Sequence, residues 1–141
     1  MKKLIACFLA CIMMFSCCVG ALAVTEDMMR ASISISSTTA TLGTGVNSGE
    51  VKITYQVRAS KTASPIGASS IAIYKSDGSY VTTIRGTTSN GLMANSTTSK
   101  SGTYTYKGTS GTSYYAKVTF SATAGSEHDS KTVTTNTARA K

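Results

Sequence analysis

The ten-residue stretch VKITYQVRAS, residues 51–60, decides the fold. Apolar residues stand at every second position from Val51 to Ala59, and polar or charged residues stand between them. A period of two is typical of a β-strand with one buried face and one face in water. Residues 114–122, YYAKVTFSA, repeat the pattern. The two stretches therefore predict a β-sheet protein with Tyr55 and Tyr114 in its core.

Shorter segments with the same alternation lie on both sides of these two stretches. They cover residues 33–42 (with a break), 71–73, 80–85, 104–106 and 131–137. Asp77-Gly78 is a strong turn signal between them, because both residues tolerate the positive φ that tight hairpin turns need. The polar stretch 87–101 predicts a long surface loop that holds at most one weak edge strand, and residues 125–129 predict a turn. No segment has a convincing helical pattern.

Seven strands with one wet face each predict an all-β, antiparallel sandwich of two sheets. We expect the immunoglobulin-like (Ig-like) or fibronectin-III-like kind, without a disulfide, since no cysteine follows Cys18. A small Greek-key barrel is the alternative. Tyr114 begins the sixth predicted strand, where Ig-type sandwiches often place a tyrosine whose hydroxyl bonds to the preceding loop.

The N-terminus predicts export. Lys2 and Lys3 precede an apolar run over residues 4–22, and Ala21 and Ala23 are the small residues that signal peptidase requires. The predicted organisation is a signal peptide (1–23), a flexible tail (24–30) and one β-sandwich domain (31–141). A retained membrane anchor and a lipoprotein signal acylated at Cys17 or Cys18 are the alternatives. The expected product is secreted, has no thiol and has no membrane contact after signal removal.

Composition agrees with an exported β-protein. Residues 24–141, the 118 residues that remain after the predicted cleavage, carry 12 basic and six acidic residues, a net charge of +6, and 43 of them are Ser or Thr. Threonine favours strands, and serine favours turns. The basic residues are spread over many strands, which indicates solvated faces and protected sheet edges rather than a specific nucleic-acid site. An anionic envelope polymer is the alternative partner.

Four stretches carry a resemblance to a known family: residues 30–32 (RAS), 66–74 (IGASSIAIY), 104–108 (YTYKG) and 114–120 (YYAKVTF). In these stretches the chain resembles a family of small secreted proteins of unknown function from Gram-positive anaerobes of the gut. The resemblance covers most of residues 30–140. It implies export from a bacterial cell and a β-sandwich fold, and it implies no active site.

The residues predict no catalytic centre, metal site or cofactor. The one histidine, His128, lies between Glu127 and Asp129, and neighbours in an extended chain point to opposite faces, so the three side chains do not converge. A zinc site of the usual kind needs further ligands, and no second histidine exists. No Gly-x-Ser-x-Gly motif is present. We therefore expect His128 in a solvated loop.

Three outward-facing tyrosines are the best candidates for a binding site: Tyr74, Tyr80 and Tyr115, with Lys75 and Arg85 nearby. Exposed tyrosines can stack on sugar rings or anchor a protein partner. The sequence thus predicts a secreted, non-catalytic module with a binding or structural role, or alternatively a module that binds glycans or envelope polymers.

Two further alternatives are less favoured. One is a hydrolase that uses His128. The other is a polymer subunit, in which cleavage after Arg30 frees the strand that begins at Ala31 to pair with a neighbouring molecule, Ile33 and Ile35 being the inserted side chains.

Overall fold

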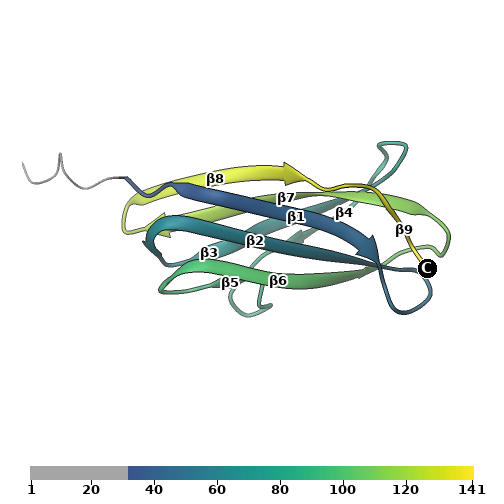
Figure 1. Ribbon diagram of the computed structural model, residues 1–141, viewed down its shortest axis with the longest axis horizontal. Coiled ribbons are helices and arrows are strands. Elements are labelled where there is room, and N and C mark those ends of the chain that lie inside the picture. The colour runs from purple at the N-terminus through teal and green to yellow at the C-terminus, as the bar shows by residue number, and fades with distance from the viewer. Residues whose placement is uncertain (1–31) are drawn as a thin grey trace, which may run out of the picture. The chain divides into compact units, whose positions relative to one another are not determined.

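Nine β-strands make up the part of the chain that the computed structural model describes, residues 32–141 (Figure 1). No helix in this part is long and apolar enough to cross a membrane. The predicted signal peptide, the tail, Arg30 and Ala31 lie outside the described residues. The strands are β1 (Ile35–Thr44), β2 (Glu50–Ala63), β3 (Ile66–Lys75), β4 (Tyr80–Arg85), β5 (Met93–Ala94), β6 (Thr97–Lys107), β7 (Ser113–Ala124), β8 (Glu127–Thr134) and β9 (Ala138–Arg139).

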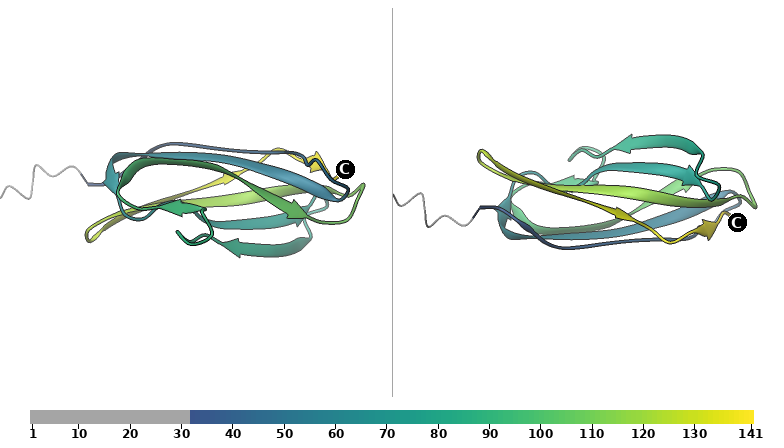
Figure 2. Two further views of the ribbon diagram at one scale, coloured as in Figure 1. Left: turned by 90° about the horizontal axis from the view of Figure 1, so that it is seen from below. Right: turned by 90° about the horizontal axis from the view of Figure 1, so that it is seen from above.

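The strands form two sheets, and Figure 2 shows them as two layers. Sheet A has the order β1-β2-β6, and sheet B has the order β4-β3-β7-β8. The short β5 pairs with β3, and the short β9 pairs with β7. Every pairing is antiparallel. The predicted all-β, antiparallel, two-sheet architecture is therefore confirmed.

The alternating residues build the core between the sheets. All five odd-numbered positions from Val51 to Ala59 are buried, as are all five even-numbered positions from Tyr114 to Ala122. Tyr55 and Tyr114 are each 2% exposed, which confirms their predicted places. The rings of Tyr55 and Phe120 meet across the core with centroids 6.4 Å apart. The two stretches that decide the fold thus pack face to face.

The predicted break in the first strand is a β-bulge. Ile33 and Ile35 are buried at odd positions, whereas Ala40 and Leu42 are buried at even ones. One extra residue is needed to change the phase, and the register of β1 against β2 shifts between Ile35 and Ser37. The two isoleucines named in the strand-exchange hypothesis thus lie in the core of their own domain; the cleavage itself, at Arg30, stays a prediction.

The structure has nine strands where seven were predicted. The additional β5 and β9 have two residues each, too few to show an alternating pattern. The predicted surface loop over residues 87–101 was also too long, since Thr97–Ser101 belong to β6. The weak edge strand that the prediction allowed there is the first part of β6, an edge strand of sheet A. Residues 97–101 have no apolar face, and they are strand because they pair with β2. Similarly, β3 begins at Ile66 rather than at Ile71, because its first residues pair with β5 and β7.

The last long strand is displaced from its predicted place. β8 covers Glu127–Thr134, whereas residues 125–129 were predicted as a turn and residues 131–137 as the strand. The turn is tighter than expected because Gly125 takes a positive φ of 63°. The strand ends early because the Thr135 hydroxyl, not a backbone carbonyl, accepts the N–H of Ala116 at 2.9 Å.

Candidate functional site

Tyr74, Tyr80 and Tyr115 come together on the outer face of sheet B. They stand on β3, β4 and β7, and the register pairs Tyr74 with both Tyr80 and Tyr115. The rings of Tyr74 and Tyr115 stack with centroids 5.2 Å apart and an interplanar angle of 11°. Tyr80 meets Tyr74 edge-on, with centroids 5.7 Å apart. We call these three residues the tyrosine cluster.

The turn between β3 and β4 sets the register in which Tyr80 pairs with Tyr74. Gly78 adopts a φ of 89°, and the Lys75 N–H donates to the Ser79 carbonyl at 2.9 Å. The Asp77 carboxylate accepts the Ser79 N–H at 2.8 Å. Hydrogen bonds from Ser79 hold the pKa of Asp77 below its usual value, so this turn is charged at neutral pH. The tight turn places Tyr80 directly opposite Tyr74.

Lys117 joins the cluster from β7. Its Nζ lies 5.2 Å from the centroid of the Tyr74 ring, within the range of a cation–π interaction. The register places Lys117 opposite Ala72, and the small side chain of Ala72 leaves room for the lysine to lean towards Tyr74. Sequence reasoning missed this residue. Alternation did place Lys117 outward, two positions after Tyr115, but its neighbour across the strands depends on the register.

The cluster has polar and apolar surface available for a ligand. Tyr80 is 61% exposed, and its hydroxyl donates to Thr83 at 3.2 Å. Among residues 32–141, no group hydrogen-bonds to the hydroxyl of Tyr74 or Tyr115, both of which are half-buried. Two phenol groups are thus available for hydrogen bonds, and the Tyr80 ring is available for apolar contact.

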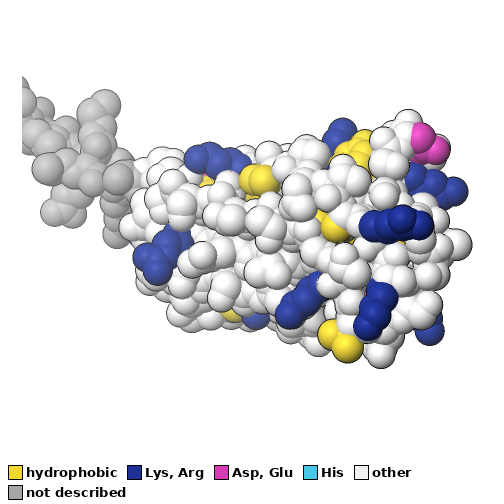
Figure 3. All heavy atoms as spheres, turned by 45° about the vertical axis from the view of Figure 1, so that its right-hand side comes forward, with side chains coloured by type: hydrophobic (Ala, Val, Ile, Leu, Met, Phe, Trp, Pro, Cys, Tyr) yellow, Lys and Arg dark blue, Asp and Glu magenta, His cyan; other side chains and the backbone are white. Residues whose placement is uncertain are grey.

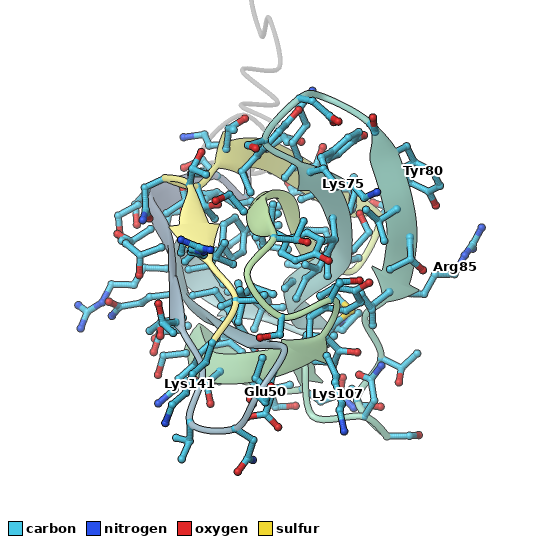
Figure 4. All side chains as sticks on the ribbon, turned by 90° about the vertical axis from the view of Figure 1, so that its right-hand side faces the viewer. Glu50, Lys75, Tyr80, Arg85, Lys107 and Lys141 are labelled. Carbon is cyan, nitrogen blue, oxygen red and sulfur yellow. The ribbon has the colours of Figure 1, made fainter. Side chains whose placement is uncertain are left out.

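The two predicted cations do not join the cluster. Lys75 directly follows Tyr74, so its side chain lies on the opposite face of β3, the face that carries Ile73. Ile73 is buried, but Lys75 is exposed because it is the last residue of the strand. Arg85 lies on the same strand as Tyr80, and both side chains project outward from β4 (Figure 4). Arg85 pairs with Ser70, about 13 Å along the strand from the tyrosine row. Lys117 therefore takes the place predicted for Lys75.

His128 lies within β8, so its predicted loop position is wrong. Its Nδ1 is 3.1 Å from the hydroxyl of Thr123, the residue opposite it on β7. Glu127 and Asp129 lie on one face of β8 and His128 lies on the other, as alternation along a strand predicts. The two carboxylates accept the N–H groups of Ile33, which precedes β1, and of Ile35, its first residue. Within residues 32–141, no three His, Asp or Glu side chains lie close enough together to hold a metal ion.

A second candidate is an open pocket of about 380 Å³ near the C-terminal residues, lined by Thr44, Ser110, Gly111, Arg139, Ala140 and Lys141. Its two cationic side chains, Arg139 and Lys141, already donate hydrogen bonds to backbone carbonyls of neighbouring loops. Arg139 Nε donates to the Gly111 carbonyl at 2.8 Å, and Lys141 Nζ donates to the Val46 carbonyl at 2.8 Å. Figure 3 shows the Lys and Arg side chains spread over the visible surface rather than joined in one patch. We therefore place the candidate site at the tyrosine cluster.

Comparison of the chain with protein families, curated proteins and solved structures gives no match.

Proposed function

We propose that this protein is an exported, non-catalytic binding module with an Ig-like sandwich of the fibronectin-III kind. In Ig constant domains the fourth strand joins the first sheet. Here the fourth strand along the chain, β4, pairs with β3 in the other sheet. The Tyr114 hydroxyl supports the Ig-like assignment, because it accepts the N–H of Thr109 in the preceding loop at 2.9 Å.

The ligand that the site supports best is a carbohydrate, such as a glycan or an envelope polymer. The observation that carries this proposal is the tyrosine cluster, in which three strands bring tyrosines 74, 80 and 115 into one row. Tyrosine combines a flat apolar ring with a hydroxyl, so it can contact the C–H face of a sugar and hydrogen-bond its hydroxyl groups. Its side chain also loses little rotamer freedom on binding.

The acidic residues support a binding role over glycoside hydrolysis, which generally needs two carboxylates that face each other across the substrate. Glu50 binds Asn47, and Asp77 binds Ser79 within its own turn. Glu127 and Asp129 bind the backbone N–H groups of Ile33 and Ile35. Each of these four carboxylates holds a local backbone segment in place.

A glycan array with the purified protein tests this function. We expect binding to at least one glycan class and about tenfold weaker binding after Tyr80→Ala or Tyr115→Ala. Val46→Ala is the matched control, because Val46 is 78% exposed in the connection between β1 and β2, away from the cluster. Binding that is unaffected by both tyrosine substitutions would place the ligand elsewhere and overturn the proposal.

A further inference from the structure

We propose that the tyrosine cluster and Lys117 select polysaccharides whose sugar rings carry carboxylates, that is, polymers of uronic acids. The inference rests on the proposed function, because it names the substrate class of the same site.

Lys117 is the charged group of this site. Its side chain is exposed, and within the described residues it forms no salt bridge. Its neighbours in the register are Ala72 on β3 and Thr134 on β8, and neither carries a charge. The Tyr74 ring, 5.2 Å from Nζ, holds the ammonium group beside the cluster without neutralising it.

The four acidic residues that the structure describes all form hydrogen bonds with groups other than Lys117. Glu127 and Asp129 bind the backbone N–H groups of Ile33 and Ile35, and Glu50 binds Asn47 in the connection between β1 and β2. Asp77 is the acid nearest in sequence to the cluster, and its carboxylate accepts the Ser79 N–H within the turn. None of these four carboxylates forms an ion pair with Lys117, so an anionic ligand can complement its charge.

The chemistry of the site calls for a sugar ring and an anion on the same ligand unit. A neutral glycan offers a ring with an apolar C–H face but leaves the ammonium group without a partner. A polyol phosphate offers an anion but has no ring to contact the tyrosines. A uronic acid carries its carboxylate directly on the pyranose ring, so one sugar unit can contact a tyrosine and form a charge-assisted hydrogen bond with Lys117.

Isothermal titration of the protein with polygalacturonate, and with the same polymer after its carboxylates have been reduced to alcohols, tests this selectivity. We expect the reduced polymer to bind about tenfold more weakly. Lys117→Met keeps a long apolar side chain but removes the charge, so it should weaken polygalacturonate binding about tenfold and weaken binding of the reduced polymer much less. Lys52→Met is the matched control, because Lys52 is exposed on the central strand of sheet A.

The outcomes separate this inference from the proposed function. If Tyr80→Ala weakens polysaccharide binding but Lys117→Met affects both polymers equally or not at all, the acid-sugar selectivity is wrong and glycan binding stands. Tighter binding of poly(glycerol phosphate) than of polygalacturonate would also overturn it. If Tyr80→Ala and Tyr115→Ala leave the binding of every polymer unchanged, the proposed function itself fails.

Discussion

The two lateral edges of the sandwich are closed by opposite chemistry. At one edge β1 of sheet A lies beside β8 of sheet B (Figure 1), and polar side chains bridge them. At the other edge the connection between β4 and β6, residues 86–96, inserts the buried side chain of Leu92. We call these the polar seam and the apolar seam. In the described residues no backbone ladder joins the two sheets at either edge, so the sheets stay separate.

In the polar seam, side chains on and after β8 bond to the backbone of residues 33–42. The N–H groups of Ile33 and Ile35 donate to Glu127 at 3.1 Å and to Asp129 at 2.6 Å. Asn136 bonds both backbone groups of Leu42, accepting from its N–H at 2.9 Å and donating to its carbonyl at 2.7 Å. These bonds satisfy backbone groups at the edge of β1 that lack a neighbouring strand.

In the apolar seam, the connection itself packs between the sheets. Leu92 is 2% exposed, and its carbonyl accepts the Ala68 N–H of β3 at 3.0 Å. Asn90 shapes the connection, because its side-chain oxygen accepts the N–H groups of Thr87 and Leu92. The apolar seam therefore depends on filled volume, whereas the polar seam depends on charge and hydrogen bonding.

Leu92→Ala has the largest expected effect. Truncation leaves a cavity between the sheets and should lower the free energy of unfolding by about 2–5 kcal/mol, measured by urea denaturation. Val46→Ala serves as the exposed control and should change it by less than about 0.5 kcal/mol. A loss below about 1 kcal/mol for Leu92→Ala would show that the apolar seam does not depend on this side chain.

Asn136→Ala breaks the polar seam at one point and has a smaller expected effect. It removes two hydrogen bonds to Leu42, so the free energy of unfolding should fall by about 1–2 kcal/mol in the same experiment. Asn95 is the matched control, because it is exposed and forms no hydrogen bond within the described residues. Equal effects of Asn136→Ala and Asn95→Ala would contradict the polar seam.

The two seams should differ in how their contribution to the free energy of unfolding depends on pH. The hydrogen bond from the Ile35 N–H lowers the pKa of Asp129 in the folded protein from 3.8, so its ionised form stabilises the fold. This contribution is present above the pKa of the unfolded chain and is lost as pH falls through the lowered folded pKa.

Asp129→Asn keeps an oxygen acceptor for Ile35 but removes the titration, so the urea midpoint of this variant should fall less between pH 6 and about pH 3 than that of the native protein. Leu92→Ala should show the native pH dependence at a lower midpoint. Identical pH profiles for Asp129→Asn and the native protein would show that this carboxylate does not stabilise the polar seam.

The ion pair between Lys61 and Glu127 has the smallest expected effect. Both side chains are about one-third exposed, so solvent and salt screen the pair. Lys61→Met should lower the free energy of unfolding by at most about 1 kcal/mol, and the difference from the native protein should shrink in 1 M salt. Lys52→Met, which removes no such pair, is the control. A loss that does not depend on salt would indicate a packing role for Lys61.

Local alternation was enough to predict the strands that carry the core and the outward direction of three tyrosines. A period of two depends on each residue and its near neighbours, so VKITYQVRAS and YYAKVTFSA identify their buried faces without any knowledge of the sheets. Polar strand segments such as Thr97–Ser101 and Glu127–Asp129 were missed for the same reason. They have no apolar face, and they are strand because β2 and β7 pair with them.

The neighbours of each side chain depend on strand order and register, which join residues far apart in the chain. The sequence indicated that Tyr74 and Lys117 both point outward, but the pairing of Ala72 with Lys117 brings the ammonium group to the ring. Likewise, the Glu127-His128-Asp129 run was predicted to be a solvated loop, whereas it belongs to β8 and its two carboxylates bind the backbone of Ile33 and Ile35. Periodicity is a local property of the chain, and contact between strands is not, so the core followed from the residues while the site and the seams required the fold.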